Sequence, residues 1–148
     1  MIYETMKKEY LNDVEKLQQE WASEDITYGV VAGTPQQIAE AMTPYCFVLK
    51  DEQKIVGYLL AELRRENEFC IFPDGASFIE VNDLFITKDY RSRGLGKMLL
   101  HHCEEEARKN GIEYVLLASA TKDAGAIRNF YTSNDYTIWT TQFFKNLD

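Results

Sequence analysis

Cysteine and proline are sparse in this chain of 148 residues, which contains three of each. The cysteines, Cys46, Cys70 and Cys103, lie far apart and form no Cys-x-x-Cys pair. An odd and dispersed set argues against a disulfide scaffold and against a zinc site built on cysteine. It is typical of proteins in a reducing compartment, so we expect a cytoplasmic protein.

Long apolar runs and an excess of basic residues are also missing. No segment approaches the ~20 apolar residues that a membrane helix needs. The segment 1–16 alternates charged and apolar residues, which is unlike a signal or transit peptide. The formal net charge is −8. Nucleic acids and anionic membranes select basic surfaces, so neither is expected as the main partner.

The negative charge is concentrated in the first half of the chain. Residues 1–74 carry 7 basic and 14 acidic side chains, whereas residues 75–148 carry 9 and 10. An acidic surface of this kind aids solubility in many proteins. The functional alternative is that the first half faces a cationic substrate and the second half an anionic cofactor.

The spacing of apolar residues predicts a single domain over residues 1–148. The pattern gives the element order β-α-α-β-β-β-α-β-α-β-β and therefore an α/β (α+β) fold with a mixed sheet. A crossover through residues 78–119 is expected to make two strands parallel. The predicted elements are a strand at 2–7, a helix at 8–22, a helix capped by Thr34, strands at 46–50, 55–63 and 78–86, a helix at 95–110, a strand at 114–119, a helix capped by Asp123, and two closing strands in "YTIWT" and "QFFKN".

A glycine-containing turn joins the strand 78–86 to the next helix. Its sequence, "DYRSRGLGK", places two glycines where the helix begins. A helix N-terminus presents unpaired N–H groups that bind phosphate, and glycine allows a ligand to approach the backbone. The P-loop pattern fails because Met98 replaces its Ser/Thr, and the dinucleotide pattern fails at Leu99. By themselves, the glycines are equally consistent with a simple turn.

The motif Arg91-x-x-Gly94-x-Gly96, after "LFITKDY" and before an amphipathic helix, resembles the [RQ]-x-x-G-x-[GA] signature of the GNAT superfamily of N-acetyltransferases. The resemblance extends from Phe78 to Tyr136, and the element order of the whole chain agrees with it. It implies acetyl-CoA as co-substrate, with the diphosphate on the turn and the pantetheine arm along the preceding strand, and no metal. The implied cofactor-binding residues are Leu84, Phe85, Ile86, Arg91, Ser92, Arg93, Gly94, Leu95, Gly96 and Lys97, with Asp123 beside the position where the family often has an asparagine.

Acetyl transfer to an amine requires loss of an ammonium proton, a donor for the thioester oxygen and protonation of the leaving thiolate. The resemblance implies Glu80 as the base, because it stands eleven residues before Arg91 as in the histone-acetylating branch of the family. It implies Tyr131 as the acid and the N–H of Leu84 or Phe85 as the donor. Glu80 could instead be an ordinary surface residue, and Tyr131 a packed aromatic residue.

Strand alternation places Asn82 on the same face as Glu80, and places Asp83, the competing carboxylate, on the other face. The family's other common base position falls near Ser119, which is a poor base. His101 and His102 have no ligand partners at suitable spacing, so we expect them to be buried or capping residues.

The acceptor in this family is bound largely by the first two helices and by loops between strands. Carboxylates and aromatic faces in these regions suit an organic cation, which predicts a small amine as substrate. A protein N-terminus or lysine, and a non-catalytic acyl-CoA-binding module, are the alternatives. The aromatic C-terminal strands could form the edge of a homodimer. The candidate acceptor residues are Glu4, Glu9, Asp13, Glu15, Glu20, Glu24, Asp25, Trp21, Tyr28, Tyr45 and Phe69.

Overall fold

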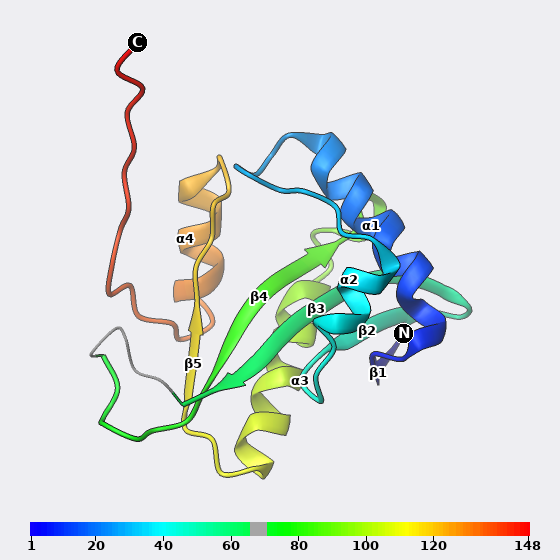
Figure 1. Ribbon diagram of the computed structural model, residues 1–148, viewed down its shortest axis with the longest axis horizontal. Coiled ribbons are helices and arrows are strands. Elements are labelled where there is room, and N and C mark those ends of the chain that lie inside the picture. Colours follow the sequence, from blue (N-terminus) through cyan, green and yellow to red (C-terminus); the bar gives the residue numbers. More distant parts are fainter. Residues whose placement is uncertain (66–70) are drawn as a thin grey trace.

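The structure, a computed structural model, describes residues 1–65 and 71–148 (Figure 1). Phe69 and Cys70, which the sequence analysis singled out, therefore lie outside the described residues. The mixed α/β fold class is confirmed. The elements are β1 (Ile2–Thr5), a 3-10 turn (Lys8–Tyr10), α1 (Leu11–Glu24), α2 (Pro35–Glu40), β2 (Phe47–Asp51), β3 (Lys54–Arg64), β4 (Phe78–Ile86), a second 3-10 turn (Lys88–Tyr90), α3 (Leu95–Lys109), β5 (Tyr114–Leu117) and α4 (Ala124–Thr132).

One five-stranded sheet, in the order β1-β2-β3-β4-β5, organises the molecule. Neighbouring strands from β1 to β4 are antiparallel, and β4 pairs with β5 in parallel through the crossover that contains α3. The expected parallel pair is therefore confirmed. Since α3 follows β4 directly, the turn between them lies at the end of a central strand.

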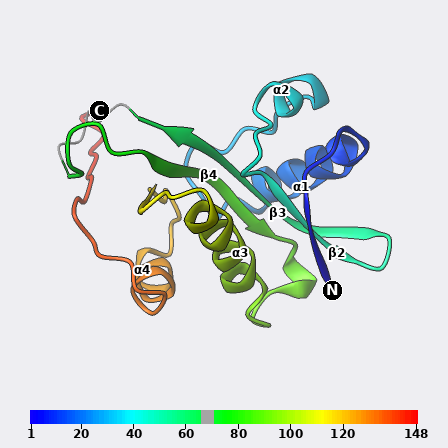
Figure 2. The ribbon, with the colours of Figure 1, turned by 90° about the horizontal axis from the view of Figure 1, so that it is seen from below.

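Helices cover both faces of this sheet (Figure 2). On one face α1 and α2 contribute Val14, Leu17 and Ile38 to a core that includes Tyr58 and Phe85 from the strands. On the opposite face α3 contributes the buried face of its amphipathic helix, and α4 lies on the same side beside β5. The central strands are buried on both faces, which explains why β3 reads as an almost continuous apolar run.

Two predicted helix caps are present as expected. Thr34 forms a capping box with Gln37: the Thr34 hydroxyl accepts from the Gln37 N–H, and the Gln37 side chain accepts from the Thr34 N–H. The carboxylate of Asp123 accepts a hydrogen bond of 3.0 Å from the N–H of Ala126 at the start of α4. Such caps satisfy N–H groups that a helix cannot pair internally.

The two predicted closing strands are absent, so that part of the element order is wrong. Residues 133–148 contain no strand, and the tail runs away from α4 as an extended segment (Figure 1). Alternating aromatic residues favour strand structure, but a strand forms only against a partner backbone, and none of the described strands pairs with this tail. Phe143 and Phe144 are 92% and 77% exposed. Their participation in a dimer edge stays a prediction.

None of the described helices is long and apolar enough to cross a membrane.

The first α-helix begins at Leu11, three residues later than predicted, because residues 8–10 form the 3-10 turn.

Gly57 on β3 leaves no room for a side chain against β4. A Cβ built on it would lie 2.5 Å from Cδ1 of Ile86 and 2.9 Å from the carbonyl oxygen of Phe85. The backbone oxygen cannot move without disturbing the strand that carries the cleft. We expect Gly57→Ala to lower the free energy of unfolding by about 1–3 kcal/mol through overpacking.

Urea unfolding followed by circular dichroism tests this expectation, with Gly125→Ala as the matched control. Gly125 lies in α4 and an added Cβ there meets nothing closer than 3.9 Å. The control should be neutral or stabilising by up to about 1 kcal/mol, because alanine favours the helix. Equal stability of the wild type and Gly57→Ala would show that the two strands have more room than the structure indicates.

Candidate active site

The site begins where β4 and β5 separate. Their parallel pairing ends at Val81 and Leu117. Beyond this point β4 continues to Ile86 and pairs only with β3, while the chain after β5 turns toward α4. A cleft of about 670 Å³ opens between them, lined by residues 81–86 on one side and 118–121 on the other. Its volume is in the range of small-molecule sites.

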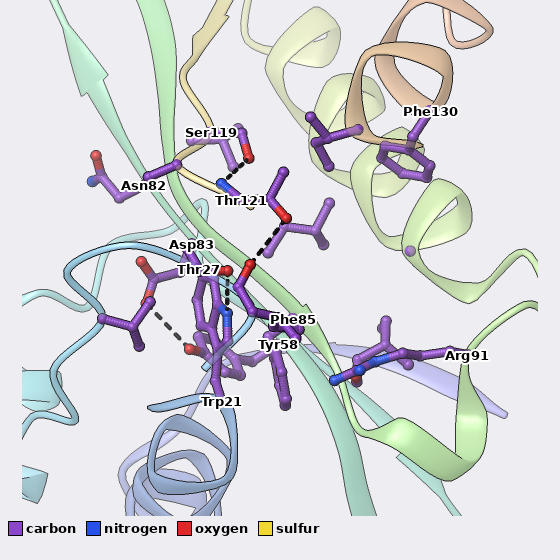
Figure 3. A pocket seen from close by; sticks show the side chains of 18 of the residues that line it. Trp21, Thr27, Tyr58, Asn82, Asp83, Phe85, Arg91, Ser119, Thr121 and Phe130 are labelled. Carbon is purple, nitrogen blue, oxygen red and sulfur yellow. Dashed lines mark hydrogen bonds between the residues drawn. The ribbon is translucent and has the colours of Figure 1, made fainter. Parts of the chain in front are cut away.

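A β-bulge lies at the point of separation. Leu60 pairs with Asp83 and Ala61 pairs with Val81, so Asn82 has no partner on β3. The extra residue shifts the alternation of side chains along β4. Asp83 therefore shares the α1 face of the sheet with Glu80, and the prediction that it points the other way, with Asn82 beside Glu80, is wrong. In Figure 3 the Asn82 side chain lies away from Asp83 and Tyr58.

Asp83 lines the cleft beside Tyr58 and Gln18. The Tyr58 hydroxyl donates to the Asp83 carboxylate at 3.2 Å (Figure 3). The Gln18 amide donates to the same oxygen at 3.4 Å. Burial raises the pKa of Asp83, and the hydrogen bond from Tyr58 opposes that rise. The pKa of Tyr58 is raised well above its ordinary value by burial and by the neighbouring carboxylate. Its hydroxyl therefore remains a donor.

Glu80, the base that the sequence predicted, is held differently. Its carboxylate accepts a charge-assisted hydrogen bond from Arg64 at 2.6 Å. It does not belong to the residues that line the cleft. The role of Glu80 as the base stays a prediction. In this structure its carboxylate forms an ion pair with Arg64.

The glycine turn forms the other end of the cleft, which Ser92, Gly94, Leu95, Gly96 and Lys97 line. Gly94 is the N-cap of α3 with φ of 73°, and no side chain caps the helix. The N–H groups of its first turn therefore lack internal partners. An added Cβ on Gly94 would meet nothing within 4 Å, so the approach to the turn is open.

Arg91 lines the cleft, but its guanidinium is bonded within the protein. It donates two hydrogen bonds of 2.6 Å to the Glu24 carboxylate and one of 2.8 Å from Nε to the carbonyl of Ile86. Glu20 adds a second tie, because it accepts from the Thr87 hydroxyl and from the N–H of Lys88. Two carboxylates of α1 thus hold the turn in place.

The two other basic side chains of the turn, Arg93 and Lys97, differ in their contacts within the protein. Arg93 donates to the carbonyl of Asp89 at 2.8 Å and lies over the ring of Tyr90. Lys97 lines the cleft and makes no ion pair with any described residue. Among the cationic groups of the turn, Lys97 is therefore the one available to a bound anion.

Tyr131 lies on α4, at the wall of the cleft formed by this helix. Its ring contacts Phe130 and Tyr136, and burial raises the pKa of its hydroxyl to about 12. Phe130 packs within 3.7 Å of where a Cβ on Gly96 would lie, which brings α4 against the start of α3. Leu84, Phe85 and Ile86 line the same cleft from β4, and their contact with the pantetheine arm stays a prediction.

The expected acceptor residues divide into two groups. Trp21 and Tyr28 line the cleft, whereas Tyr45 is buried in the core. Glu4 is bonded to Lys50 and Tyr10, away from the cleft, and Asp25 pairs with Lys122. The sequence analysis missed Gln18 and Tyr58, because a glutamine on a helix and a tyrosine in an apolar strand carry no signal of function.

Two loops at the cleft, 26–28 and 120–122, are bonded to each other. Thr27 and Thr121 form an isolated β-bridge. The N–H of Tyr28 donates to the carbonyl of Ala120, and the N–H of Lys122 donates to the carbonyl of Ile26. We call this set of contacts the loop bridge.

The histidines lie outside the cleft. His101 pairs with Glu104 on α3, and His102 packs between the rings of Tyr3 and Phe47. In the described ranges, no group of three or more His, Cys, Asp or Glu side chains is placed to hold a metal ion. Asp123, a predicted cofactor contact, is engaged as the cap of α4.

Comparison with known proteins places this geometry in a family. The model of the acetyltransferase (GNAT) family matches residues 3–136. An uncharacterised N-acetyltransferase of Lactobacillus delbrueckii subsp. lactis is 27% identical over 107 residues, which cover 71% of this chain and 60% of that protein. One of Bacillus subtilis (strain 168) is 37% identical over 65 residues, covering 44% of this chain and 46% of that protein. The chain thus spans about half of the length of these relatives.

Solved structures share the fold at low sequence identity. A protein from Bacillus halodurans has a TM-score of 0.81 at 14% identity, with 99% of this chain and 100% of that chain covered. An aminoglycoside acetyltransferase from an uncultured soil metagenomic sample, in complex with sisomicin, has a TM-score of 0.71 at 16% identity, with 99% and 96% covered. With a family model matching nearly the whole chain, a separated strand pair and an open glycine turn at a helix start, this protein belongs to the GNAT family of acetyltransferases.

Proposed function

We propose that this protein transfers the acetyl group of acetyl-CoA directly to the primary amine of a small cationic molecule, with residues 1–148 acting as one catalytic domain. The observation that carries the proposal is the polarity of the cleft. One end has the uncapped N-terminus of α3 and Lys97, and the other has Asp83 among aromatic side chains. An anionic cofactor and a cationic acceptor fit these two ends.

The residues of the cleft suit acetyl-CoA, the co-substrate of the family. The open turn at Gly94 offers N–H groups to a diphosphate, and Lys97 adds a positive charge. Along residues 82–86 the edge of β4 that faces the cleft has no neighbouring strand in the described part of the chain. Its backbone groups can therefore pair with the amides of an extended pantetheine arm. Acetyl-CoA supplies an activated acetyl group as a thioester.

Three groups of this chain serve the transfer. The N–H of Leu84 or Phe85 polarises the thioester oxygen, as the resemblance implies. Tyr131, whose pKa of about 12 keeps it protonated, donates to the sulfur as negative charge develops there. A carboxylate on β4 accepts the proton of the acceptor; Glu80 is the residue that the resemblance implies, and Asp83 is the β4 carboxylate that lines the cleft.

A small amine is favoured over a protein substrate because the loop bridge ties together two loops that line the cleft and so narrows the space for a long chain. The presence of aminoglycoside acetyltransferases among proteins of the same fold is consistent with an amino sugar as acceptor. A protein N-terminus or lysine is the alternative. A non-catalytic acyl-CoA-binding module would keep the turn without requiring Tyr131.

The proposed activity predicts thiol release from acetyl-CoA in the presence of small amines. We would incubate the protein with 1,4-diaminobutane, spermidine, sisomicin and a lysine-containing peptide, and measure free thiol and acetylated product. Turnover with at least one small amine and little with the peptide is expected. Acetylation of the peptide alone would support a protein substrate, and tight CoA binding without any turnover would support a binding module.

Replacement of the proposed acid should impair turnover without affecting the cofactor. Tyr131→Phe removes the hydroxyl while keeping the ring contacts with Phe130 and Tyr136. We expect turnover to fall by about 10²-fold, as loss of an acid usually does, with the dissociation constant of CoA nearly unchanged. Steady-state kinetics and calorimetry test both parts. Wild-type turnover in this variant would make Tyr131 a packing residue.

Arg91→Ala should weaken CoA binding by about tenfold, because it removes several charge-assisted hydrogen bonds that hold the turn.

Glu24→Gln distinguishes two ways in which Arg91 could support CoA binding. If Arg91 positions the turn through α1, loss of the Glu24 charge weakens CoA binding as well. If Arg91 contacts the diphosphate directly, Glu24→Gln releases it and CoA binding is unchanged or stronger. Calorimetric titration of CoA into both variants decides, with Lys97→Ala as the reference for loss of a single positive charge at the turn.

A further inference from the structure

We propose that Asp83, rather than Glu80, binds the ammonium group of the acceptor and takes its proton. This inference rests on the proposed function and deepens it, because it places the acceptor nitrogen on the α1 side of β4. It also assigns the substrate class as a primary amine that arrives in its charged form.

Asp83 is the single acidic residue among the described residues that line the cleft. The cationic residues of the lining, Arg91 and Lys97, lie at the opposite end beside the turn. Figure 3 shows Asp83 with Tyr58 and Trp21, apart from Arg91. A cation that enters the cleft therefore finds one complementary charge, and that charge is separated from the site for the cofactor phosphates.

The carboxylate of Asp83 has hydrogen-bond donors but no cationic partner in the described part of the chain. Its hydrogen-bond donors are the neutral Tyr58 hydroxyl and Gln18 amide. A half-buried carboxylate without an opposite charge is costly, and an ammonium group would relieve that cost. Two other acidic residues near the cleft are already engaged: Glu24 with Arg91 at the turn, and Asp25 with Lys122.

Glu80 is a weaker candidate for physical reasons. Its ion pair with Arg64 at 2.6 Å would have to break before an ammonium could bind, and its side chain lies outside the lining of the cleft. The bulge at Asn82 explains how Asp83 replaces it. One extra residue in β4 turns the next carboxylate toward α1 at the point where the cleft opens.

Aromatic rings surround the position of the acceptor. Trp21 stacks on Phe85 with centroids 5.3 Å apart, and Phe85 is 6.2 Å from Tyr58. The indole N–H of Trp21 is bonded to Thr27 at 3.0 Å, which fixes its orientation. Aromatic faces beside a carboxylate bind organic cations well, since they attract the charge without competing for its hydrogen bonds.

Proton transfer to Asp83 accompanies the transfer of the acetyl group from sulfur to nitrogen. The carboxylate of Asp83 takes one proton from R–NH₃⁺ and becomes a carboxylic acid. The freed lone pair forms the new C–N bond to the acetyl carbon, the C–S bond breaks, and the sulfur takes its electron pair and a proton from the hydroxyl of Tyr131. The nitrogen then loses its second proton, which reaches the Tyr131 oxygen through solvent and restores the neutral hydroxyl. Asp83 releases its proton to solvent when the product departs.

The raised pKa of Asp83 is consistent with this role. A carboxylate of higher pKa is a better base, and the groups that face it, Tyr58 from β3 and Gln18 from α1, carry no charge. Since only the ionised form binds ammonium, kcat/KM for a charged amine should rise with pH through the pKa of Asp83.

The test compares Asp83→Asn with Glu80→Gln as the matched control. Both variants replace a β4 carboxylate by its amide. The acceptors are the best amine of the panel above, which is charged at neutral pH, and O-benzylhydroxylamine, which is neutral there. The readouts are kcat/KM for each acceptor, the dissociation constants of CoA and of the amine in the presence of CoA, and the melting temperature.

We expect Asp83→Asn to lower kcat/KM for the charged amine by about 10²-fold or more, and to weaken amine binding, with CoA binding unchanged. The loss should shrink for the neutral acceptor, which needs neither the charge nor the base. It should also shrink as the pH rises and the charged amine loses its own proton. Glu80→Gln should stay within about threefold of wild type, because its carboxylate does not face the acceptor.

Other outcomes overturn the inference. Near-wild-type kinetics in Asp83→Asn, with a large loss in Glu80→Gln, would return the base to Glu80. An equal loss of kcat/KM for the charged and neutral acceptors would show that Asp83 has only a structural role. Tyr58→Phe, which removes a hydrogen-bond donor to Asp83 and leaves the carboxylate charge, would then lower kcat/KM as much as Asp83→Asn does. Absence of acetyl transfer by the wild type with every amine would instead refute the proposed function itself, and this inference with it.

Discussion

The separation of β4 from β5 is the constraint on which the site depends. As long as the two strands are paired, their backbone groups satisfy each other and leave no room for a ligand. Past Val81 and Leu117 this pairing stops, and the bulge at Asn82 coincides with the change. The cleft, the exposed edge of β4 and the direction of Asp83 all follow from this local geometry. The rest of the sheet, buried on both faces, keeps the two diverging segments in fixed positions.

Helix α1 links the two ends of the cleft. Its residues Glu20 and Glu24 hold the turn before α3, while Gln18 and Trp21 reach the region of Asp83. A single rigid helix thus sets the distance between the phosphate-binding turn and the acceptor end. Two acidic residues of the first half of the chain, Glu20 and Glu24, are thus engaged in contacts within the protein, whereas Asp83, the acidic residue among the described residues that line the cleft, belongs to the second half.

Much of this arrangement could be predicted from the sequence, for identifiable reasons. Apolar periodicity revealed β4 and α3, and the motif around Gly94 and Gly96 revealed the turn, because both depend on local residue types. The direction of Asp83 could not be predicted, since a bulge changes strand alternation and depends on how β3 pairs with β4. The engagement of Arg91 by Glu24 joins residues 67 positions apart, which no local pattern reports. The closing strands were expected from aromatic content, which shows propensity but supplies no partner.

The loop bridge has a consequence for access to the cleft. It consists of the Thr27–Thr121 bridge and two backbone hydrogen bonds between surface loops, and the exposed ion pair of Asp25 with Lys122 lies beside it; none of these contacts belongs to the sheet. Such contacts open at a small fraction of the free energy that global unfolding requires. Parting of these loops would widen the cleft without unpairing any strand of the sheet. Exchange of bulky ligands becomes a local loop motion that leaves the catalytic framework undisturbed.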